Sequence, residues 1–402
     1  MKFVFLIVLA LVQTASASCD NLSPQEFWSK VKAVHPDLIA SKARLEIADG
    51  QIVGANVRPN PQLNLSADTG EALEGDVQSI EAGFLIPIEL GGKRSARMDA
   101  AQKYKAVAAS DFDIHQSDTL IKTYVEIHNL RQMFELETLQ KEALKSMQRY
   151  QENLNKRKSL SPEQEVELGT IELALSDMSL KLADTANKRL EISRHLGFFA
   201  GLDCAIQIGS LPKSLKLEKL IIESDVSGGE VKSAKARLDQ SLAQMELEKA
   251  NAARNINIGP IFRYEKQNID ETYAVGLALS FEMPFFDRNQ GERTKAANEV
   301  VASRITFENT QKEARFDLET WYTRYHRLIA SLEESSKASM LQEKRKKVER
   351  FFERGVISAS LVIETYRQLI EFTQSRNSFE LSAIYARAQI LKLTGKIDQL
   401  NL

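Results

Sequence analysis

The sequence predicts a mainly α-helical protein with a small β part, in which long coiled-coil helical hairpins are joined to four membrane β-strands per protomer. Three observations lead to this fold class. Helical patterns run for about sixty residues without a break, the chain repeats its motifs after about 197 residues, and each half carries two strand-like patterns. A repeat of this length, with strands and helices in the same order, predicts two structural repeats within one unit.

A secretory signal is predicted at the N-terminus. Lys2 precedes an apolar run over residues 3–12, and the small residues Ala15-Ser16-Ala17 follow as a cleavage pattern. The apolar run is too short to cross a membrane as a helix. We therefore expect a signal peptide over 1–17, a first repeat over 18–205 and a second repeat over 206–402.

The two cysteines, Cys19 and Cys204, both lie just outside the long helical patterns. Export would place them in an oxidising compartment, where disulfides form and persist. We expect a disulfide between them. The alternative is lipidation of Cys19, although Ser16 stands where a lipobox prefers an aliphatic residue.

The first half opens with a helix and two strands. Ser23-Pro24 is typical of a helix start, because serine caps the helix and proline fits its first position. The helix is interrupted near His35-Pro36 and resumes to about Asn56. Alternating apolar residues predict strands over 62–69 and 77–86, and the Gly- and acid-rich stretch 69–76 predicts the loop between them.

Two long helices follow. After Gly92 the chain contains no proline or glycine up to Arg157, which predicts a helix roughly 100 Å long at about 1.5 Å per residue. Ser161-Pro162 then starts a second helix. Apolar residues at spacings of three, four and seven predict an antiparallel coiled-coil hairpin. They are Leu136, Ala143, Met147, Tyr150 and Leu154 in the first helix, and Leu168, Ile171, Leu175, Met178, Leu182, Thr185, Ile192 and Leu196 in the second.

The same order returns in the second half. A helix is predicted over about 230–254, then a strand over 257–266 and a second strand that ends before Pro284, which has no N–H to donate. The aromatic pair Phe285-Phe286 follows. A long helix is expected up to Arg354, with Trp321, Tyr325, Leu328 and Leu332 in step, and after a break the last helix ends near Gly395.

Composition excludes several classes of protein. The net charge of −2 gives no basic surface for nucleic acid, and after residue 17 no apolar run approaches the ~20 residues of a membrane-spanning helix. Strands of about ten residues are long enough to cross a bilayer and contact its lipid. Four strands cannot close a barrel, and open sheet edges are not tolerated in lipid. We therefore expect a trimer with a shared twelve-stranded α/β-barrel channel; the alternative is a secreted helical rod with small β-caps.

Several motifs carry a family resemblance: HPDL at 35–38, RPNPQLNL at 58–65, PIELGGKR at 87–94, SPEQEV at 161–166 and MPFFDRNQG at 283–291. The whole mature chain resembles the TolC-like outer membrane factors, and within them the CzcC-like branch of heavy-metal efflux. The resemblance implies a homotrimer in the outer membrane of a Gram-negative bacterium, with a long periplasmic α-barrel. It also implies docking onto a periplasmic adaptor protein and an inner-membrane RND-type pump. Ile256-Asn257-Ile258 departs from the proline pair that the family usually carries in the second half.

No catalytic or metal-binding pattern is present. The five histidines are scattered without ligand spacing, and neither cysteine has a neighbouring histidine or cysteine. We expect neither an enzyme nor a cofactor nor a specific metal site. The function that the resemblance implies is passive conduction of exported solute, heavy-metal cations above all. The alternatives are an outer-membrane duct for drug efflux or type I secretion, and a periplasmic coiled-coil scaffold without a pore.

The breaks between the paired helices are the candidate contact sites. The resemblance implies that they meet the adaptor, with a small apolar centre flanked by arginine. The alternative is that the arginines are ordinary solvated charges. The first break carries Arg157, Lys158, Ser159 and Leu160, and the second carries Arg354, Gly355, Val356, Ile357 and Ser358.

Two further positions complete the candidates. Glu364 lies nine residues after Gly355, where the family often carries an acidic ring at the channel entrance. Three symmetry-related copies would attract cations and raise one another's pKa; the alternative is a surface glutamate on a coiled coil. Asp287, Arg288 and Asn289 are expected to cap the following long helix.

Overall fold

The computed structural model describes residues 22–72, 75–206, 211–221, 225–267, 269–335, 338–354 and 356–400. The chain forms two compact units, which are described separately here. Unit 1 comprises Met1–Ile39, Gln116–Ser224 and Leu318–Leu402, and unit 2 comprises Ala40–His115 and Asp225–Asp317. Each unit draws on both predicted repeats. The expected signal peptide, 1–17, lies outside the described residues.

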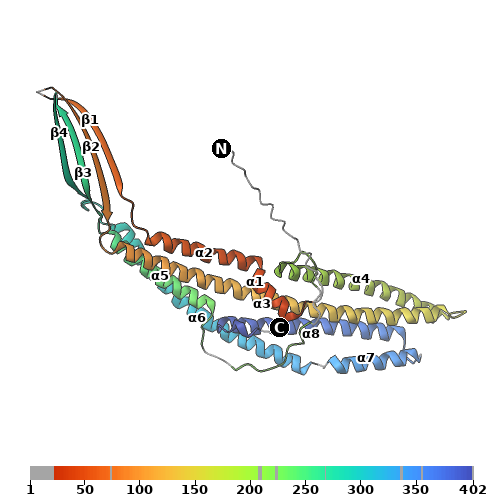
Figure 1. Ribbon diagram of the computed structural model, residues 1–402. Helices are drawn as coiled ribbons and strands as arrows, with labels where there is room; N and C mark the ends of the chain where they lie inside the picture. The colour runs from red at the N-terminus through yellow and green to blue at the C-terminus, as the bar shows by residue number, and fades with distance from the viewer. Residues whose placement is uncertain are drawn as a thin grey trace, which may run out of the picture. The chain divides into compact units, whose positions relative to one another are not determined.

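Unit 2 contains one antiparallel sheet with the order β1-β2-β3-β4 (Figure 1). The strands are β1 (Gln62–Ala72), β2 (Gly75–Ile88), β3 (Ile256–Gln267) and β4 (Asp270–Phe281). The four predicted strands are confirmed, but the loop expected over 69–76 is largely strand. Pairing continues there from Thr69↔Gln78 to Ala72↔Gly75, because glycine and acidic residues still offer backbone N–H and C=O groups to the ladder.

The register places most of the large apolar residues of the four strands on one face. Leu63 is opposite Phe84, Ile80 is opposite Tyr264, and Phe262 is opposite Val275. The side chains of this face are exposed on β4, where Val275, Leu277, Leu279 and Phe281 alternate. The other face is small or polar and holds an ion pair of 2.6 Å between Arg263 and Glu81. An exposed apolar face on a sheet of this length is typical of contact with lipid.

Pro87 lies inside β2, although the predicted strand ends at residue 86. It pairs in register with Asn257 of β3. The pairing of β1 with β2 stops at Gln62↔Leu85, so β2 has a neighbour on only one side at residue 87. The missing N–H of proline therefore leaves no gap in a two-sided ladder.

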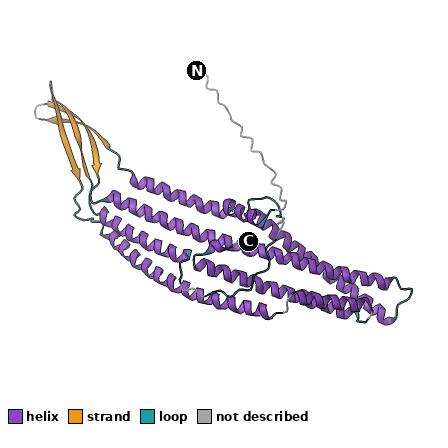
Figure 2. Cartoon of the chain, turned by 60° about the horizontal axis from the view of Figure 1, so that its bottom comes forward, coloured by secondary structure: helices purple, strands orange, loops and turns teal. Residues whose placement is uncertain are grey.

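The sheet connects directly to four helices of unit 2, which lie side by side with α2 and α6 outermost (Figures 1 and 2). They are α5 (Gly229–Asn251) and the unit 2 parts of α2 (Pro36–Asn56), α3 (Lys93–Asn155) and α6 (Gln290–Glu334). Polar bonds link neighbours: Lys105 of α3 pairs with Asp49 of α2 at 2.5 Å, and Arg237 of α5 pairs with Asp111 of α3 at 2.7 Å.

Unit 1 is helical in its described residues apart from turns and loops. It contains α1 (Pro24–Val34), α4 (Pro162–Phe199), α7 (Ala338–Glu353), α8 (Ala359–Leu393), a short 3-10 helix (Ile397–Gln399) and the remaining parts of α3 and α6. The helix start predicted at Ser23-Pro24 is confirmed, and Ser23 and Glu26 form the capping box of α1. Among the described helices, none combines the length and the apolar character that a membrane-crossing helix needs.

The predicted coiled-coil positions of α3 and α4 are confirmed as core positions. Leu136, Ala143, Met147 and Leu154 are buried in one cluster with Ile171 and Met178. The partly buried residues Tyr150, Leu168 and Leu175 pack against this cluster. The hairpin is therefore stabilised by the burial that its spacing predicts.

The long helix predicted to run to Arg354 is divided into α6 and α7. α6 ends at Glu334 and α7 begins at Ala338. The buried stripe of α6 also differs from the predicted one. It contains Tyr322, Tyr325, Ile329 and Leu332, whereas Trp321 and Leu328 are only half-buried.

A segment that crosses unit 1, here called the strap (residues 211–221), is fixed by side chains from three helices. Leu215 N–H donates to Glu380 of α8 at 2.7 Å, and Arg131 of α3 donates to Ser214 at 3.2 Å. From α6, the hydroxyls of Tyr325 and Tyr322 donate to the carbonyls of Glu218 and Ile221, both at 2.9 Å. The strap thus satisfies its backbone groups without secondary structure of its own.

Candidate functional site

The first hairpin end joins α3 to α4. Arg157, Lys158 and Ser159 are exposed, and Leu160 is half-buried. Ser161 closes the turn with a capping box, because its hydroxyl accepts from Gln164 N–H while its own N–H donates to the Gln164 side chain at 3.1 Å. The helix start predicted at Ser161-Pro162 is therefore confirmed, and it holds the basic residues of the turn toward solvent.

The second hairpin end joins α7 to α8. Arg354 is exposed, Val356 is 67% exposed and Ile357 is half-buried. Val356 N–H donates to the carbonyl of Phe351 at 2.9 Å, and Ser358 occupies the N-cap position of α8 without a side-chain bond. Gly355 lies outside the described residues.

The two hairpin ends share one hydrophobic core. Leu160 of the first end and Ile357 of the second both pack against the cluster that contains Leu154, Phe352 and Ala359. The rings of Tyr150 and Phe352 lie 4.0 Å apart between their centroids. Figure 2 shows both turns at the same end of unit 1. The predicted contact residues are therefore brought together, with an apolar centre and a basic rim.

A bond between the two hairpins supports this arrangement. Glu167 of α4 accepts a hydrogen bond of 2.7 Å from the N–H of Ala359, the first residue of α8. Ala359 N–H is one of the first helical N–H groups that lack a partner within the helix, and Glu167 supplies its acceptor. The sequence did not point to Glu167, because its partner lies 192 residues away.

Glu364 lies on α8 within a local ion-pair cluster. Its carboxylate accepts two hydrogen bonds from Arg367, at 2.8 Å and 2.6 Å, and one from Gln368 at 2.7 Å. These bonds, that from Arg367 first, lower the pKa of Glu364 to about 2. In the single chain its negative charge is therefore largely compensated by Arg367, and the expected acidic ring stays a prediction.

A buried ion pair that sequence reasoning missed joins α3 to α8. Arg131 donates to Glu380 at 2.7 Å, with both side chains buried. Burial alone would raise the pKa of Glu380, but Arg131 and the bonds from Leu215 and Gln132 outweigh it and lower the pKa. Nothing in the sequence around Arg131 or Glu380 indicates that these charged side chains are buried.

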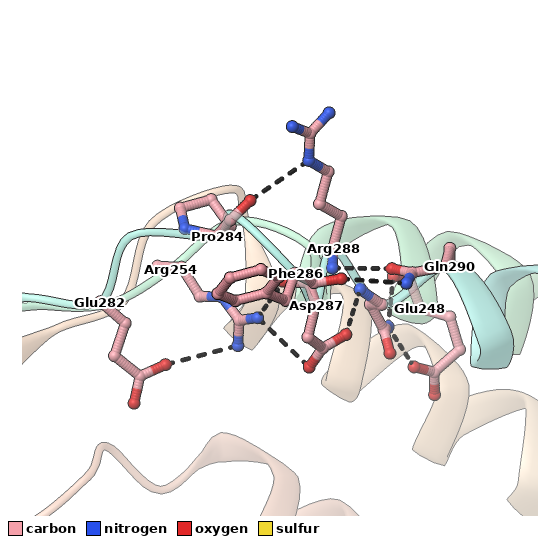
Figure 3. A network of polar contacts seen from close by, with 9 residues as sticks. Glu248, Arg254, Glu282, Pro284, Phe286, Asp287, Arg288 and Gln290 are labelled. Carbon is pink, nitrogen blue, oxygen red and sulfur yellow. Dashed lines mark hydrogen bonds and ion pairs between the residues drawn. The ribbon is translucent and has the colours of Figure 1, made fainter.

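The junction between β4 and α6 is held by a polar network, drawn in Figure 3. Arg254 reaches Glu282 at 3.4 Å and Asp287 at 3.3 Å. Asp287 also accepts from Asn289 N–H at 2.9 Å, and the Asn289 amide donates to Glu248 at 2.8 Å. Asn289 adopts a left-handed φ of 58° directly before α6, so these residues form a structural turn, and their capping of α6 stays a prediction.

The aromatic residues of this junction are exposed. Phe285 is 69% and Phe286 94% exposed, although two large apolar side chains in water are costly. The network fixes the backbone while the rings stay uncovered. This arrangement is suited to insertion of the rings at a membrane interface.

The remaining predicted positions are the cysteines. Cys204 is half-buried in the loop that follows α4, and its carbonyl lies against Gly197, where a Cβ would approach it to 2.0 Å. Cys19 lies outside the described residues, so the disulfide stays a prediction. Within the described ranges, no three His, Cys, Asp or Glu side chains are grouped so that they could hold a metal ion by themselves.

Comparisons with known proteins agree with this architecture. The family described as outer membrane efflux protein matches residues 28–158. The cobalt-zinc-cadmium resistance protein CzcC of Cupriavidus metallidurans is 26% identical over 288 residues, which cover 67% of this chain and 66% of that protein, just under two thirds of its length.

Solved structures share the fold. The open state of the MtrE outer membrane channel of Neisseria gonorrhoeae has a TM-score of 0.71 at 15% identity, covering 93% of this chain and 89% of that one. The outer membrane protein VceC of Vibrio cholerae has a TM-score of 0.69 at 15% identity, covering 92% and 95%. At these identities the likeness establishes the fold and nothing finer.

Proposed function

The chain belongs to the outer membrane efflux protein family, whose members are non-enzymatic outer membrane channels with a helical periplasmic part, and from this premise we propose its function. Three copies form the exit channel of a tripartite efflux system. The channel passively conducts exported solute, namely heavy-metal cations, from the periplasm to the exterior. Its partners are a periplasmic adaptor at the hairpin ends and an inner-membrane RND-type pump.

The observation that carries the proposal is the open sheet of unit 2. In the order β1-β2-β3-β4, strands β1 and β4 each have a neighbour on only one side. One face of this sheet is apolar and exposed, which is suited to contact with lipid. In lipid, the unpaired backbone N–H and C=O groups of the two edge strands would be costly. Pairing β4 of one copy with β1 of the next removes both edges, and three copies of four strands give a twelve-stranded barrel around an aqueous bore.

The outermost helices of unit 2 support the same side-by-side association. The apolar residues Ile47 and Val53 of α2 and Val301 and Ile305 of α6 are exposed. On α2, a Cβ at Gly50 or Gly54 would meet no atom within 4 Å. Because α2 leads into β1 and α6 follows β4, the two apolar helix faces lie at the same two edges as the unpaired strands. A head-to-tail ring covers both.

Adaptor docking at the hairpin ends rests on their shared core. Val356 is exposed at the second end, and Leu160 and Ile357 pack against the cluster that both ends share. A small apolar centre with a charged rim is the usual anatomy of a helix-docking surface. The cation substrate rests on the relative CzcC, whose name records resistance to cobalt, zinc and cadmium.

The proposal is tested by complementation of a strain that lacks the chain. We expect the wild-type chain to restore growth on cobalt, zinc and cadmium salts. Val356→Glu should abolish that growth at normal trimer abundance, because a charge would enter the apolar centre of the docking surface. Ser375→Glu introduces the same charge at an exposed position of α8, away from the hairpin end. It is the matched control and should behave as wild type.

The outcomes separate the alternatives. Restored resistance to drugs but not to metal salts would replace the cation substrate with drug efflux, and restored protein export would favour type I secretion. Normal metal resistance in Val356→Glu would refute the docking assignment. A chain that is absent from the outer membrane fraction would overturn the channel itself in favour of a scaffold.

A further inference from the structure

A basic surface lies where the sheet joins the helices of unit 2. The strand register brings the start of β1, the end of β2, the start of β3 and the end of β4 to one end of the sheet, through the pairs Gln62↔Leu85, Ile88↔Ile256 and Ile256↔Phe281. The segments that adjoin this end are here called the collar (residues 57–61, 89–97, 252–255 and 282–293). The collar contains seven basic and four acidic residues, so its net charge is positive.

Polar bonds join the segments of the collar to one another. Arg94 donates to the backbone carbonyl of Asn56 at 2.9 Å, directly before the first segment. Lys93 donates to the side chain of Asn255 at 2.7 Å. The polar network of Figure 3 then joins Arg254 to the junction between β4 and α6. The collar is therefore one connected surface of unit 2.

The acidic residues of the collar are already paired. Their partners are Arg97 for Glu89, Arg254 for Glu282 and Asp287, and Lys295 for Glu292. Within the described ranges, Arg58, Arg288 and Arg293 form no ion pair, and all three are exposed. Arg288 donates to the carbonyl of Pro284 at 3.2 Å, and Figure 3 shows its side chain pointing away from Asp287. These three guanidinium groups are therefore available to an anionic partner.

Large apolar side chains are exposed on the same surface. Leu90 lies at the junction between β2 and α3, and Met283, Phe285 and Phe286 lie at the junction between β4 and α6; each is at least 40% exposed. Cations beside aromatic and aliphatic side chains are typical of a membrane interface, where the charge meets the headgroups and the apolar group enters the bilayer. A lipid surface therefore fits the collar better than a soluble anion, which would leave these side chains in water.

The far end of the sheet carries the opposite charge. Glu71 of β1 lies opposite Asp76 of β2, and Asp270 and Glu271 begin β4. Lys266, on the neighbouring strand β3, is paired with Glu271 at 3.8 Å. An anionic membrane surface would therefore repel this end of the sheet and attract the collar.

We propose that the collar binds the phosphate groups of anionic phospholipids in the periplasmic leaflet of the outer membrane. Arg58, Arg288 and Arg293 contact the headgroups, and Phe285 and Phe286 enter the apolar layer beside them. The site rests on the membrane channel of the proposed function. It adds the class of lipid that surrounds the base of the barrel and a charge difference that sets the direction of the sheet in the membrane.

The test is native mass spectrometry of the mature full-length protein, purified in a non-ionic detergent and mixed with equal amounts of phosphatidylglycerol and phosphatidylcholine. Both lipids contain a phosphate diester, but phosphatidylcholine also carries a cation and has no net charge. We expect the trimer to retain at least about five times more phosphatidylglycerol than phosphatidylcholine at low ionic strength, and this excess should fall as NaCl is added.

Substitutions at the three unpaired arginines locate the site. The variant that combines Arg58→Gln, Arg288→Gln and Arg293→Gln should retain the two lipids about equally. Lysine at the same three positions keeps the charge and should keep the preference, which separates loss of charge from loss of structure. The same preference in the glutamine variant as in wild type, or a wild-type trimer without any preference, would overturn the site.

A matched control removes the same charge elsewhere in unit 2. It combines Lys42→Gln on α2 with Arg304→Gln and Lys312→Gln on α6, all at exposed positions outside the collar. It should retain lipid as wild type does, and a loss of preference in this control would overturn the assignment to the collar.

The same spectra report the number of chains in the assembly. A trimer without lipid preference overturns the lipid site alone, whereas a monomer contradicts the proposed channel and the site with it. An assembly of more than three chains that the glutamine variant loses would assign the collar to contact between copies in place of lipid.

Discussion

Glu167 of α4 caps the first residue of α8, since its carboxylate accepts a hydrogen bond of 2.7 Å from the N–H of Ala359. The two residues belong to different hairpins, and the bond joins those hairpins beside the residues that we propose as the docking surface. The conformation of the second hairpin end therefore depends on a side chain of the first.

Glu167→Ala should destabilise the start of α8. It removes the acceptor of Ala359 N–H, and loss of a helix cap costs about 1 kcal/mol. We expect faster amide hydrogen exchange over the first turn of α8 and a lower midpoint of thermal unfolding. Glu165→Ala, an exposed position on the same helix, is the control. Equal exchange in the two variants would show that the cap is unimportant.

Breaking the buried ion pair between Arg131 and Glu380 should lower the stability of the folded chain more than Glu167→Ala does. Arg131→Met leaves the Glu380 carboxylate buried without its partner, which costs about 3–5 kcal/mol. The double variant Arg131→Met with Glu380→Leu leaves no unpaired charge and should recover part of the loss. The midpoint of thermal unfolding measures both. A double variant that loses the sum of the two single effects would contradict this account.

The same pair predicts an acid dependence of stability. The pKa of Glu380 is lowered in the folded chain, so its contribution is fully present above the unfolded value of about 4.3. It is lost as the pH falls from that value through the folded pKa. We expect wild type to lose stability below about pH 4 more steeply than Glu380→Gln. Parallel curves for the two proteins would argue against this role.

Two strand glycines give a matched pair for the sheet. A Cβ at Gly259 would approach the carbonyl oxygen of Phe84 to 1.8 Å, whereas a Cβ at Gly276 would meet only the Ile261 side chain at 3.4 Å. Gly259→Ala should therefore disturb the pairing of β2 with β3 and cost about 1–3 kcal/mol. Gly276→Ala should be neutral. The temperature at which the purified oligomer dissociates in detergent measures both, and equal temperatures would contradict the close approach.

Glu364 gives a prediction about ion selectivity. Its pairing with Arg367 means that Glu364→Gln removes a negative charge and leaves Arg367 less compensated, so cation permeability should fall relative to anion permeability. Arg367→Gln should shift it the other way. Because the pKa of Glu364 is about 2, wild-type selectivity should stay constant between about pH 4 and pH 7. Unchanged reversal potentials in both variants would refute the prediction of an acidic ring at Glu364.

Local sequence patterns predicted the elements of this fold well. The alternation in 275–281 and the heptad spacing of Leu136, Ala143 and Ile171 depend on side-chain periodicity, which is visible in one sequence. The cap at Ser161 depends on four adjacent residues. The family inferred from the strand–helix junction motifs agrees with the outer membrane efflux protein match over 28–158.

The main features that were missed depend on partners far apart in the sequence. Arg131 and Glu380 are 249 residues apart, and neither carries a signal that it is buried. The apolar periodicity of the sequence continues past Glu334, so it does not mark the end of α6 there. The described residues of the strap form no helix or strand. The strap is held by side chains from three distant helices, which its own sequence does not reveal.

The central claim is that one chain supplies only part of a membrane barrel and that three chains share it. Native mass spectrometry of the protein extracted from the outer membrane in detergent tests this directly. The account predicts a single assembly with three times the mass of the mature chain. A stable monomer, recovered in the soluble periplasmic extract, would contradict it.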